Sequence, residues 1–591
     1  MKIPHTPARL RLLPLAGSLL LAACASTSPL PHAAAPAGTQ AAALHVDVPT
    51  IQRPQSETPQ WWYRDGAAQA AERGAMNGRA KNVIVFLGDG MSLATVAAAR
   101  ILEGQRKGMS GEENRLAWET FPNTALSKTY NTNSQTPDSA GTMSAIATGA
   151  KTRIGVLSIG QSAPRGDCKA ALATPLLTLW ELAASTGMAT GVVTTTRVTH
   201  ATPAATFSHS ADRNWESDAD LPPEARAAGC LDIARQMIES PYGHGPDVLM
   251  GGGRSNLMPA TQRDPEYDDK VGARLDGRDL IAEWQQRHPG GAYVWNAAQL
   301  RAAPVDKPLL GLFEPDHMHF EHDRAQDPAG EPSLAEMTRA AITRLARNPD
   351  GYVLLVEGGR IDHAHHAGNA FRALDETIAF SDAVRVASEM TSPQDTLILV
   401  TADHSHTLSF AGYPARGNPI LGKVKGGSGE DSDPNQLARD ASGLPYTTLS
   451  YANGPGYTGA SSRQPEGPKR YEHLLEDVRP IHNGRPDLTQ VNTEDPDYMQ
   501  EALVPTKAET HGGDDVGVWA RGPGSAAVRG SLEENAIYHV LLQATPRLRA
   551  AACAQQLCDG NGVPVILPDP KASLSGLSNQ RSKITQKKAD L

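Results

Sequence analysis

The sequence has few cysteines, no long apolar run and no excess of basic residues, and each shortage excludes a class of protein. The five cysteines form no CxxC pair, which excludes a zinc site built from paired cysteines. Beyond its first residues, the chain has no stretch of the about 18 apolar residues that a transmembrane helix needs. The net charge of −10 argues against a nucleic-acid-binding site, because a phosphate backbone is bound by a basic face. An acidic protein can still bind small anions where metal ions supply positive charge.

The first 23 residues have the parts of a bacterial lipoprotein signal peptide. Lys2, Arg9 and Arg11 form a basic start, an apolar run covers residues 12–21, and small residues precede Cys24. We expect cleavage before Cys24, which would then carry lipid; the alternative is an ordinary signal peptide. Either predicts export. The protein would be periplasmic, tethered to the outer membrane or released from the cell, and would contact the membrane only through a lipid anchor.

Composition divides the rest of the chain. Residues 24–57 are rich in Ala, Pro, Ser and Thr and predict a flexible tether, while the polar, Lys-rich residues 566–591 predict a disordered tail. Residues 412–505 are rich in Gly, Pro, Ser, Asn and Asp and predict an inserted, loop-rich subdomain. The body of the protein is therefore expected in residues 58–411 and 506–565.

Short apolar runs alternate with helical stretches in the body. The runs cover residues 83–87, 191–195, 352–356, 396–400 and 516–520, and the helical stretches include 140–150, 176–185 and 333–347. Because each run is apolar throughout, it is typical of a strand buried on both faces of a parallel sheet. The pattern predicts an α/β fold: a three-layer αβα sandwich around a mostly parallel central sheet.

Acidic, histidine and threonine side chains adjoin five of these runs. They are Asp89; His200 and Thr202; Glu357, Asp362, His363 and His366; Asp403 and His404; and His511. One such residue would be an ordinary cap or turn residue. Five strand ends with the same chemistry predict a metal centre, because ligands bind at the carboxyl ends of strands in open α/β sheets. Imidazole with carboxylate suits zinc, and carboxylate with hydroxyl suits magnesium.

Ser139 and Arg213 are the candidate groups for phosphate chemistry. Ser139 opens a helix of small residues, where the positive field of the helix N-terminus favours a phosphoryl group; the alternative is an ordinary serine cap. No Ser-His-Asp pattern is evident, so activation by a metal ion is expected. A guanidinium such as Arg213 can hold phosphate through two hydrogen bonds, although in isolation it more often forms a surface salt bridge.

Four cysteines remain after Cys24. They are Cys168, Cys230, Cys553 and Cys558. An even number in an oxidising compartment predicts disulfides. Sequence proximity favours pairing Cys553 with Cys558, which leaves Cys168 for Cys230; the alternative is four free thiols.

Five motifs together resemble the alkaline phosphatases. They are Gly88-Asp89-Gly90, Asp138-Ser139-Ala140, VEGGRIDH at 356–363, TADHSH at 401–406, and Glu509-Thr510-His511. The likeness covers about residues 61–558. It is nearer to the animal-type branch, because His200 stands where the best-known bacterial form has aspartate.

This resemblance implies hydrolysis of small phosphate monoesters at alkaline pH through a phosphoserine, with two zinc ions and one magnesium ion. It makes 58–411 and 506–565 the catalytic domain and 412–505 a crown-like insertion. The implied residues are Ser139 as nucleophile; Arg213 as phosphate clamp; Asp362, His366 and His511 for the first zinc; Asp89, Asp403 and His404 for the second; Asp89, Thr202 and Glu357 for magnesium; and His200 and His363, which would act through water.

The resemblance also implies a calcium ion, held by Glu266, the carbonyl of Phe313, Glu314 and Glu331. Glu331 stands where the family pattern predicts aspartate, but calcium coordination is tolerant and the longer side chain can still reach the ion. The alternative is a group of solvated surface acids.

The family is usually homodimeric, with an N-terminal helix that crosses to the partner. The aromatic residues 61–63 fit that role, or else pack on the body of their own chain. Two rival functions remain: a relative acting on phosphodiesters or sulfate esters, and a lipoprotein that binds metal or phosphate without turnover. Relatives that act on diesters or sulfate esters often use threonine or a modified cysteine as the nucleophile. Ser139, Arg213 and the magnesium ligands therefore favour monoesters.

Overall fold

The computed structural model describes residues 44–48, 56–426 and 433–571. The predicted signal peptide, Cys24, and most of the predicted tether and C-terminal tail lie outside the described residues. Among the helices of the described segments, none is long and apolar enough to cross a membrane.

A ten-stranded sheet runs through the described part of the chain, in the order β17-β2-β16-β8-β1-β7-β3-β4-β6-β5. Its strands are β1 Asn82–Gly88, β2 Asn123–Lys128, β3 Ala189–Arg197, β4 Val248–Gly252, β5 Ala292–Val294, β6 Leu309–Leu312, β7 Tyr352–Gly358, β8 Thr396–Ala402, β16 Val516–Arg521 and β17 Gly530–Glu533. From β8 to β5 all neighbours are parallel. The predicted mostly parallel α/β sheet is therefore confirmed, except that β16 runs antiparallel to both of its neighbours.

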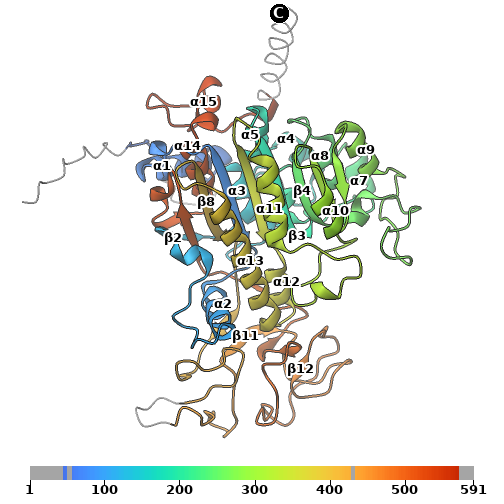
Figure 1. The fold of residues 1–591 in the computed structure, drawn as a ribbon, viewed down its shortest axis with the longest axis vertical. Helices are drawn as coiled ribbons and strands as arrows, with labels where there is room; N and C mark the ends of the chain where they lie inside the picture. The colour runs from blue at the N-terminus through green and yellow to red at the C-terminus, as the bar shows by residue number, and fades with distance from the viewer. Residues whose placement is uncertain (1–43, 49–55, 427–432, 572–591) are drawn as a thin grey trace, which may run out of the picture. The chain divides into compact units, whose positions relative to one another are not determined.

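Alternate residues of β1 face two different cores, which is why the run is apolar throughout. Val83 and Val85 pack with one group of helices, and Ile84 and Phe86 pack with the other. The first group is α1 Pro59–Glu72, α3 Ser139–Thr148, α5 Leu179–Ser185 and α14 Ala536–Ala544; the second is α2 Leu93–Arg106, α11 Leu334–Leu345 and α13 Ala370–Met390. Figure 1 shows α11 and α13 over one face of the sheet. The sheet is therefore the middle layer of a sandwich, with helices on both faces.

The remaining helices and strands are short. They are α4 Cys168–Ala173, α6 Ala201–Ala204, α7 Pro223–Ala227, α8 Ile233–Glu239, α9 Leu280–Arg287, α10 Ala297–Ala302, α12 Arg360–His366, α15 Pro546–Ala554, β9 Ser405–His406 and β15 His511–Gly512. Within the insertion or at its edges lie β10 Leu408–Phe410, β11 Leu449–Gly454, β12 Lys469–Arg470, β13 Tyr498–Met499 and β14 Ala502–Pro505. These small sheets lie at the lower end of the view, near α2 and α12 (Figure 1).

The aromatic residues of α1 pack on the body of their own chain. Trp62 and Tyr63 are buried, and the Trp62 carbonyl accepts a hydrogen bond of 2.7 Å from Asn535 Nδ2, at the start of α14. Gln543 Nε2 of α14 donates to the Ala67 carbonyl at 2.8 Å. These aromatic side chains are therefore packed within their own chain. A helix that crosses to a partner subunit stays a prediction.

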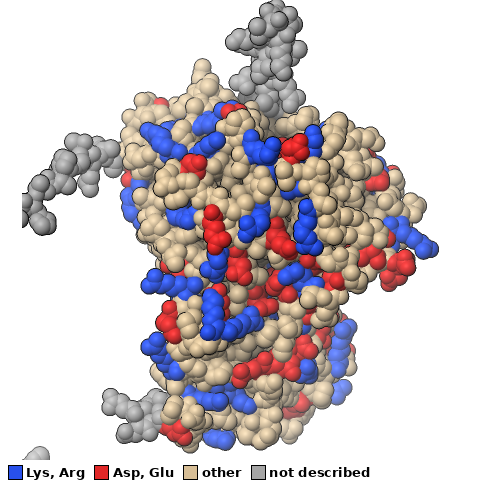
Figure 2. Space-filling model, viewed as in Figure 1, with Lys and Arg blue, Asp and Glu red and all other residues tan. Residues whose placement is uncertain are grey.

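Both predicted disulfides are present, Cys168–Cys230 and Cys553–Cys558. The first joins α4 to the segment after α7, which is 62 residues away in sequence, and the second closes a small loop after α15. On the face shown in Figure 2, acidic and basic side chains are interspersed, without a broad area of one sign.

Candidate active site

The candidate site lies where neighbouring strands of the parallel sheet end. β1 lies between β7 and β8, in a register that aligns the last residues of all three strands. Asp89 therefore follows β1 at the level where Asp403 follows β8, and Glu357 lies at the end of β7. Side chains that are more than 250 residues apart in sequence meet there because parallel strands end on the same edge of the sheet.

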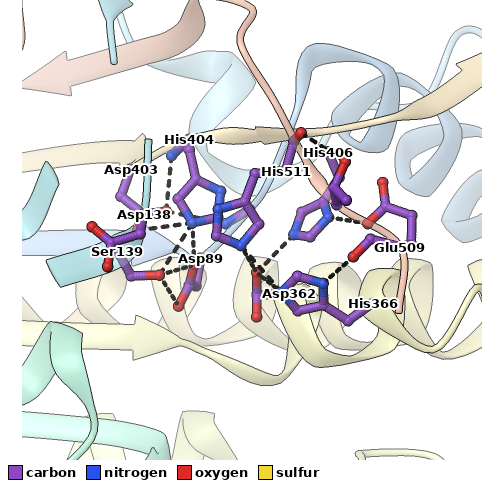
Figure 3. Close-up of polar contacts among 12 residues, drawn as sticks. Asp89, Asp138, Ser139, Asp362, His366, Asp403, His404, His406, Glu509 and His511 are labelled. Atoms are coloured by element: carbon purple, nitrogen blue, oxygen red, sulfur yellow. Dashed lines mark hydrogen bonds and ion pairs between the residues drawn. The ribbon is translucent and has the colours of Figure 1, made fainter. Parts of the chain in front are cut away.

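Ser139 is the first residue of α3, but it does not cap the helix. Asp138 is the cap, and its Oδ1 accepts a hydrogen bond of 3.0 Å from the Gly141 amide. The Ser139 hydroxyl is thus free to face the strand ends, 3.2 Å from Asp89 Oδ1 and 3.1 Å from His404 Nε2 (Figure 3). The ordinary serine cap is therefore excluded.

Asp362, His366 and His511 converge as predicted for a zinc site. Asp362 Oδ1 lies 3.4 Å from His366 Nε2 and 3.3 Å from His511 Nε2, and the first two residues share one face of α12. The Nδ1 atoms of the two rings lie 2.5 Å from the Glu509 carbonyl and 2.8 Å from the Pro137 carbonyl. Each Nδ1 therefore carries the hydrogen, which leaves the Nε2 lone pair directed at the cluster, as a metal ligand requires.

Asp89, Asp403 and His404 form the second predicted set, and all three side chains are fully buried. His404 Nε2 lies 3.3 Å from Asp89 Oδ1 and 3.5 Å from Asp403 Oδ2. Burial, reinforced by the carboxylates of Asp403 and Asp362, raises the pKa of Asp89 well above its ordinary value. Such crowding of buried carboxylates is costly without a cation, so the residues present fit a divalent ion.

His406 and Glu509 belong to this site although the sequence assigned them no role. The two ring nitrogens of His406 face two carboxylates: Nε2 lies 2.7 Å from Asp362 Oδ1, and Nδ1 contacts Glu509 (Figure 3). Burial alone would lower the pKa of His406, but the two carboxylates raise it to about 10. His406 is therefore a charged donor that holds Asp362 in place. Gly90, with φ +68°, makes room for this ring, because a Cβ there would lie 2.3 Å from it.

The predicted magnesium residues also meet. Asp89, His200 and Glu357 place ligand atoms within 4.8 Å of one another. Thr202 lies beside Glu357, and Glu357 Oε2 accepts from Thr194 Oγ1 at 2.5 Å. Burial raises the pKa of Glu357 to about 8. A buried carboxylate with a second carboxylate and a hydroxyl beside it fits a hard cation such as magnesium.

Arg213 lies beside Ser139, as a phosphate clamp must. Its Nη1 donates to Asp138 Oδ2 and its Nη2 faces His200 Nε2, each at 3.1 Å. His363 Nδ1 faces Arg360 Nη1 at 2.9 Å. Burial and the adjacent guanidinium hold the pKa of both histidines well below its ordinary value, so the rings are neutral. The arginines therefore leave the hydrogen on His200 Nδ1 and His363 Nε2.

His317 was missed by the sequence reading. Its ring lies 4.3 Å from that of His363 and 5.4 Å from that of His200, and Arg197 Nη1 contacts its Nε2 at 2.7 Å. It follows β6, a run of four residues that is too short to stand out as a strand. Had that run been recognised as a strand, the expectation that ligands bind at the carboxyl ends of strands would have pointed to His317.

A second acidic cluster lies in the loops that follow β4 and β6. The three acidic residues predicted for calcium lie there in two adjoining groups: Glu314 lies close to Glu331 in one and close to Glu266 in the other. Phe313, the fourth predicted residue, is buried in the core next to Glu314. Asp327 and His319, which the sequence did not indicate, join the same cluster. It is thus a converging site rather than a set of separate surface acids.

The family model for alkaline phosphatase matches residues 80–546 of the chain. The tissue-nonspecific alkaline phosphatase of Gallus gallus is 40% identical over 533 residues, which cover 87% of this chain and 95% of the relative. The corresponding isozyme of Rattus norvegicus is 43% identical over 474 residues, 79% of this chain and 84% of the relative.

Solved structures agree with these relatives. The Thermus thermophilus alkaline phosphatase has a TM-score of 0.54 and 26% identity, covering 80% of this chain and 92% of that chain. The alkaline phosphatase of the Antarctic bacterium TAB5 shares the fold, with a TM-score of 0.50 at 19% identity, covering 79% and 98%. The resemblance read from the five motifs is confirmed: the chain belongs to the alkaline phosphatase family and is a phosphomonoesterase.

Proposed function

We propose that the enzyme hydrolyses small phosphate monoesters to an alcohol and inorganic phosphate at alkaline pH, through a phosphoserine at Ser139. The observation that carries this proposal is the position of the Ser139 hydroxyl. It lies between Asp89 and His404, at the N-terminus of α3 and beside Arg213. A helix N-terminus and a guanidinium both favour a phosphoryl group at that point.

The cofactors we propose are two zinc ions and one magnesium ion. Asp362, His366 and His511 would hold one zinc ion, and Asp89, Asp403 and His404 the other. Magnesium would be held by Asp89, Thr202 and Glu357. When bound, these ions would supply the positive charge that favours deprotonation of Ser139 and of water, and that offsets the charge on the phosphoryl oxygens.

The residues of the chain would orient the phosphate. Arg213 would bind two of its oxygens, with Asp138 holding the guanidinium in position. His200 Nδ1 and His363 Nε2, which carry their hydrogens, would donate to phosphate or to water around it. Because both rings are neutral, they would add donors without adding charge.

Hydrolysis would take two in-line displacements. In the first, Ser139 Oγ loses its proton to solvent and forms a bond to phosphorus while the ester P–O bond breaks, and the alcohol oxygen leaves with the electron pair and takes a proton from solvent. In the second, a water oxygen loses a proton to solvent and forms a bond to phosphorus while the bond from Ser139 Oγ to phosphorus breaks, and Oγ leaves with the electron pair and takes a proton from solvent. Two inversions give net retention at phosphorus. An alkaline optimum follows, because both nucleophiles act deprotonated.

The domain division is also proposed: catalytic residues 58–411 and 506–565, with 412–505 as a crown-like insertion. We further propose an exported homodimer that is held to the membrane only by lipid on Cys24. Mass analysis of the N-terminus and a sedimentation measurement of the intact protein test these two points separately from catalysis.

The test of the activity compares p-nitrophenyl phosphate with bis-p-nitrophenyl phosphate at alkaline pH, with and without a chelator. The wild type should hydrolyse the monoester, lose activity to the chelator and regain it with zinc and magnesium. Ser139→Ala should lose nearly all activity. Ser144→Ala is a matched control on the same helix, because the Ser144 side chain bonds only to backbone groups. Preference for the diester would indicate a phosphodiesterase instead. No turnover of either substrate by metal-loaded protein would indicate a protein that binds metal or phosphate without catalysis.

A further inference from the structure

The middle strand of a small sheet in the insertion lies between two strands that adjoin proposed metal ligands. The sheet has the order β10-β11-β14. β10 follows the segment that ends at His406, and β14 is the last strand before His511. β11 comes from the interior of residues 412–505 and pairs with both of these strands. A strand of the insertion therefore joins two segments of the metal site.

Tyr451 of β11 reaches the helix that carries two of the proposed zinc ligands. Its hydroxyl lies 2.8 Å from Nδ1 of His365, which stands next to His366 on α12. The other ring nitrogen of His365, Nε2, lies 2.9 Å from the hydroxyl of Thr95 on α2. Tyr451, His365 and Thr95 are all buried. Because a neutral imidazole has one donor and one acceptor, and a hydroxyl can serve as either, both ring nitrogens are satisfied.

These two hydroxyls hold the His365 ring from both sides, and with it the rotation of α12 about its axis. Asp362 and His366 belong to the same helix, so its rotation decides where their ligand atoms point. The His365 ring also stacks on that of His406, with centroids 4.9 Å apart, and His406 Nε2 lies 2.7 Å from Asp362 Oδ1. A shift of His365 would therefore reach Asp362 both through the helix and through His406.

Asn453, the next residue on the same face of β11, holds the segment that carries the third proposed ligand. Its Oδ1 accepts a hydrogen bond from the Thr510 amide, and its Nδ2 donates to Thr510 Oγ1, both at 2.9 Å. Thr510 directly precedes His511. One face of one strand thus contacts α12 through Tyr451 and the segment of His511 through Asn453.

We propose that β11 of the insertion positions the first zinc site, with Tyr451 and Asn453 as the positioning residues. The inference rests on the proposed function, because it needs the zinc ion proposed at Asp362, His366 and His511. Tyr451 orients the first two of these ligands, and Asn453 orients the third. Neither residue binds the metal or the substrate.

The effect should be confined to this site. Among the described residues, no hydrogen bond links β11 to the second proposed zinc set, Asp89, Asp403 and His404. At the first site, the two segments also touch directly, because the Glu509 amide donates to the His366 carbonyl at 2.9 Å. Loss of one contact from β11 should therefore weaken zinc binding without abolishing it.

The experiment measures zinc affinity in the intact enzyme by competition with a zinc chelator at fixed magnesium. It compares the wild type with Tyr451→Phe and Asn453→Ala. The matched controls are Tyr446→Phe and Asn483→Ala, which lie in the same insertion, and among the described residues neither side chain makes a hydrogen bond. Anomalous diffraction at the zinc edge assigns each ion to its ligands. The kcat and KM for p-nitrophenyl phosphate are measured at low and at saturating zinc.

Tyr451→Phe should bind zinc at the first site about 10-fold more weakly or worse, which is the usual cost of losing a group that orients a ligand. Asn453→Ala should show a smaller decrease, because its hydrogen bonds are exposed whereas that of Tyr451 is buried. The second zinc ion and both controls should match the wild type. At low zinc the kcat of both variants should fall while KM stays the same, and saturating zinc should restore it.

Two results would overturn the inference: equal weakening of both zinc sites, which indicates a general loss of stability, or unchanged affinity at the first site in Tyr451→Phe. Because the two substitutions remove different hydrogen bonds, Asn453→Ala decides the question if Tyr451→Phe fails to fold. A wild type that holds no zinc at Asp362, His366 and His511 would overturn the proposed zinc site itself, and the inference with it.

Discussion

Asp138 holds Arg213 with the same carboxylate that caps the helix of Ser139. Oδ2 lies 3.1 Å from Arg213 Nη1, while Oδ1 accepts from the Gly141 amide at 3.0 Å, and both oxygens accept from Gly155. One side chain thus fixes the start of α3 and the direction of the guanidinium. Ser139, the proposed nucleophile, and Arg213, the proposed phosphate clamp, are therefore positioned relative to each other by one side chain.

Asp138→Ser should separate these two tasks. Serine also caps helices well, so α3 should persist, but its short side chain cannot reach Arg213. A hydrogen bond to a charged group contributes about 1.5–3 kcal/mol, so a guanidinium without its anchor should bind phosphate at least about tenfold more weakly. The measurement is the inhibition constant of inorganic phosphate against p-nitrophenyl phosphate. An unchanged constant in a folded variant would show that Asp138 does not position Arg213.

Glu509→Gln should weaken the metal site around Asp362 without removing a ligand. Glu509 contacts His406, which in turn lies 2.7 Å from Asp362. Loss of a group that orients a ligand costs about 10- to 100-fold in metal affinity. The check is the zinc affinity in competition with a chelator. Glu472→Gln, at an exposed position in the insertion, is the control and should bind zinc as the wild type does.

The fold and most of the candidate site could be predicted because parallel strands leave a strong pattern in the sequence. Runs buried on both faces are apolar throughout, and the candidate ligand residues come directly after them in sequence, as Asp89 and Asp403 do. The direction of β16 could not be predicted in this way. An antiparallel strand in the interior of the sheet is just as apolar as a parallel one, and its long connection carries no direction signal.

Residues whose part in the site depends on their neighbours in space could not be predicted either. Ser139 at a helix start reads as a cap until the structure shows that Asp138 takes that place. His406 stands in a motif beside predicted ligands, and only its two carboxylate neighbours reveal that it is a charged donor. His317 and His319 follow β6, a strand too short to recognise, in a loop with no regular pattern.

The two disulfides should differ in what they contribute to stability. Cross-linking residues 62 apart constrains the unfolded chain more than cross-linking residues 5 apart, by the chain-entropy model about 4 against about 2 kcal/mol. The double substitution Cys168→Ser with Cys230→Ser should therefore lower the unfolding midpoint in denaturant more than the matching pair at Cys553 and Cys558. Equal shifts would mean that local structure, rather than loop length, sets the difference.

Glu376 should make the enzyme less stable as the pH rises from 5 to 8. This residue of α13 is 3% exposed, and burial raises the pKa of its carboxyl from 4.5 to about 8. Between these values the folded protein holds a proton that the unfolded chain has released. Stability is therefore greatest below the unfolded pKa and falls by up to about 1.4 kcal/mol per pH unit as the pH approaches 8.

Glu376→Gln should remove this dependence, because glutamine resembles the protonated side chain and can still accept the hydrogen bond of 2.5 Å from the Glu321 amide. Calorimetry at pH 5 and pH 8 should show a smaller loss of Tm for this variant than for the wild type, with the two proteins closest at pH 5. Glu472→Gln, at an exposed position, should follow the wild type at both pH values. If the wild type and Glu376→Gln lose Tm in parallel, Glu376 is already ionised in the folded protein, and the attraction of Arg360 outweighs burial.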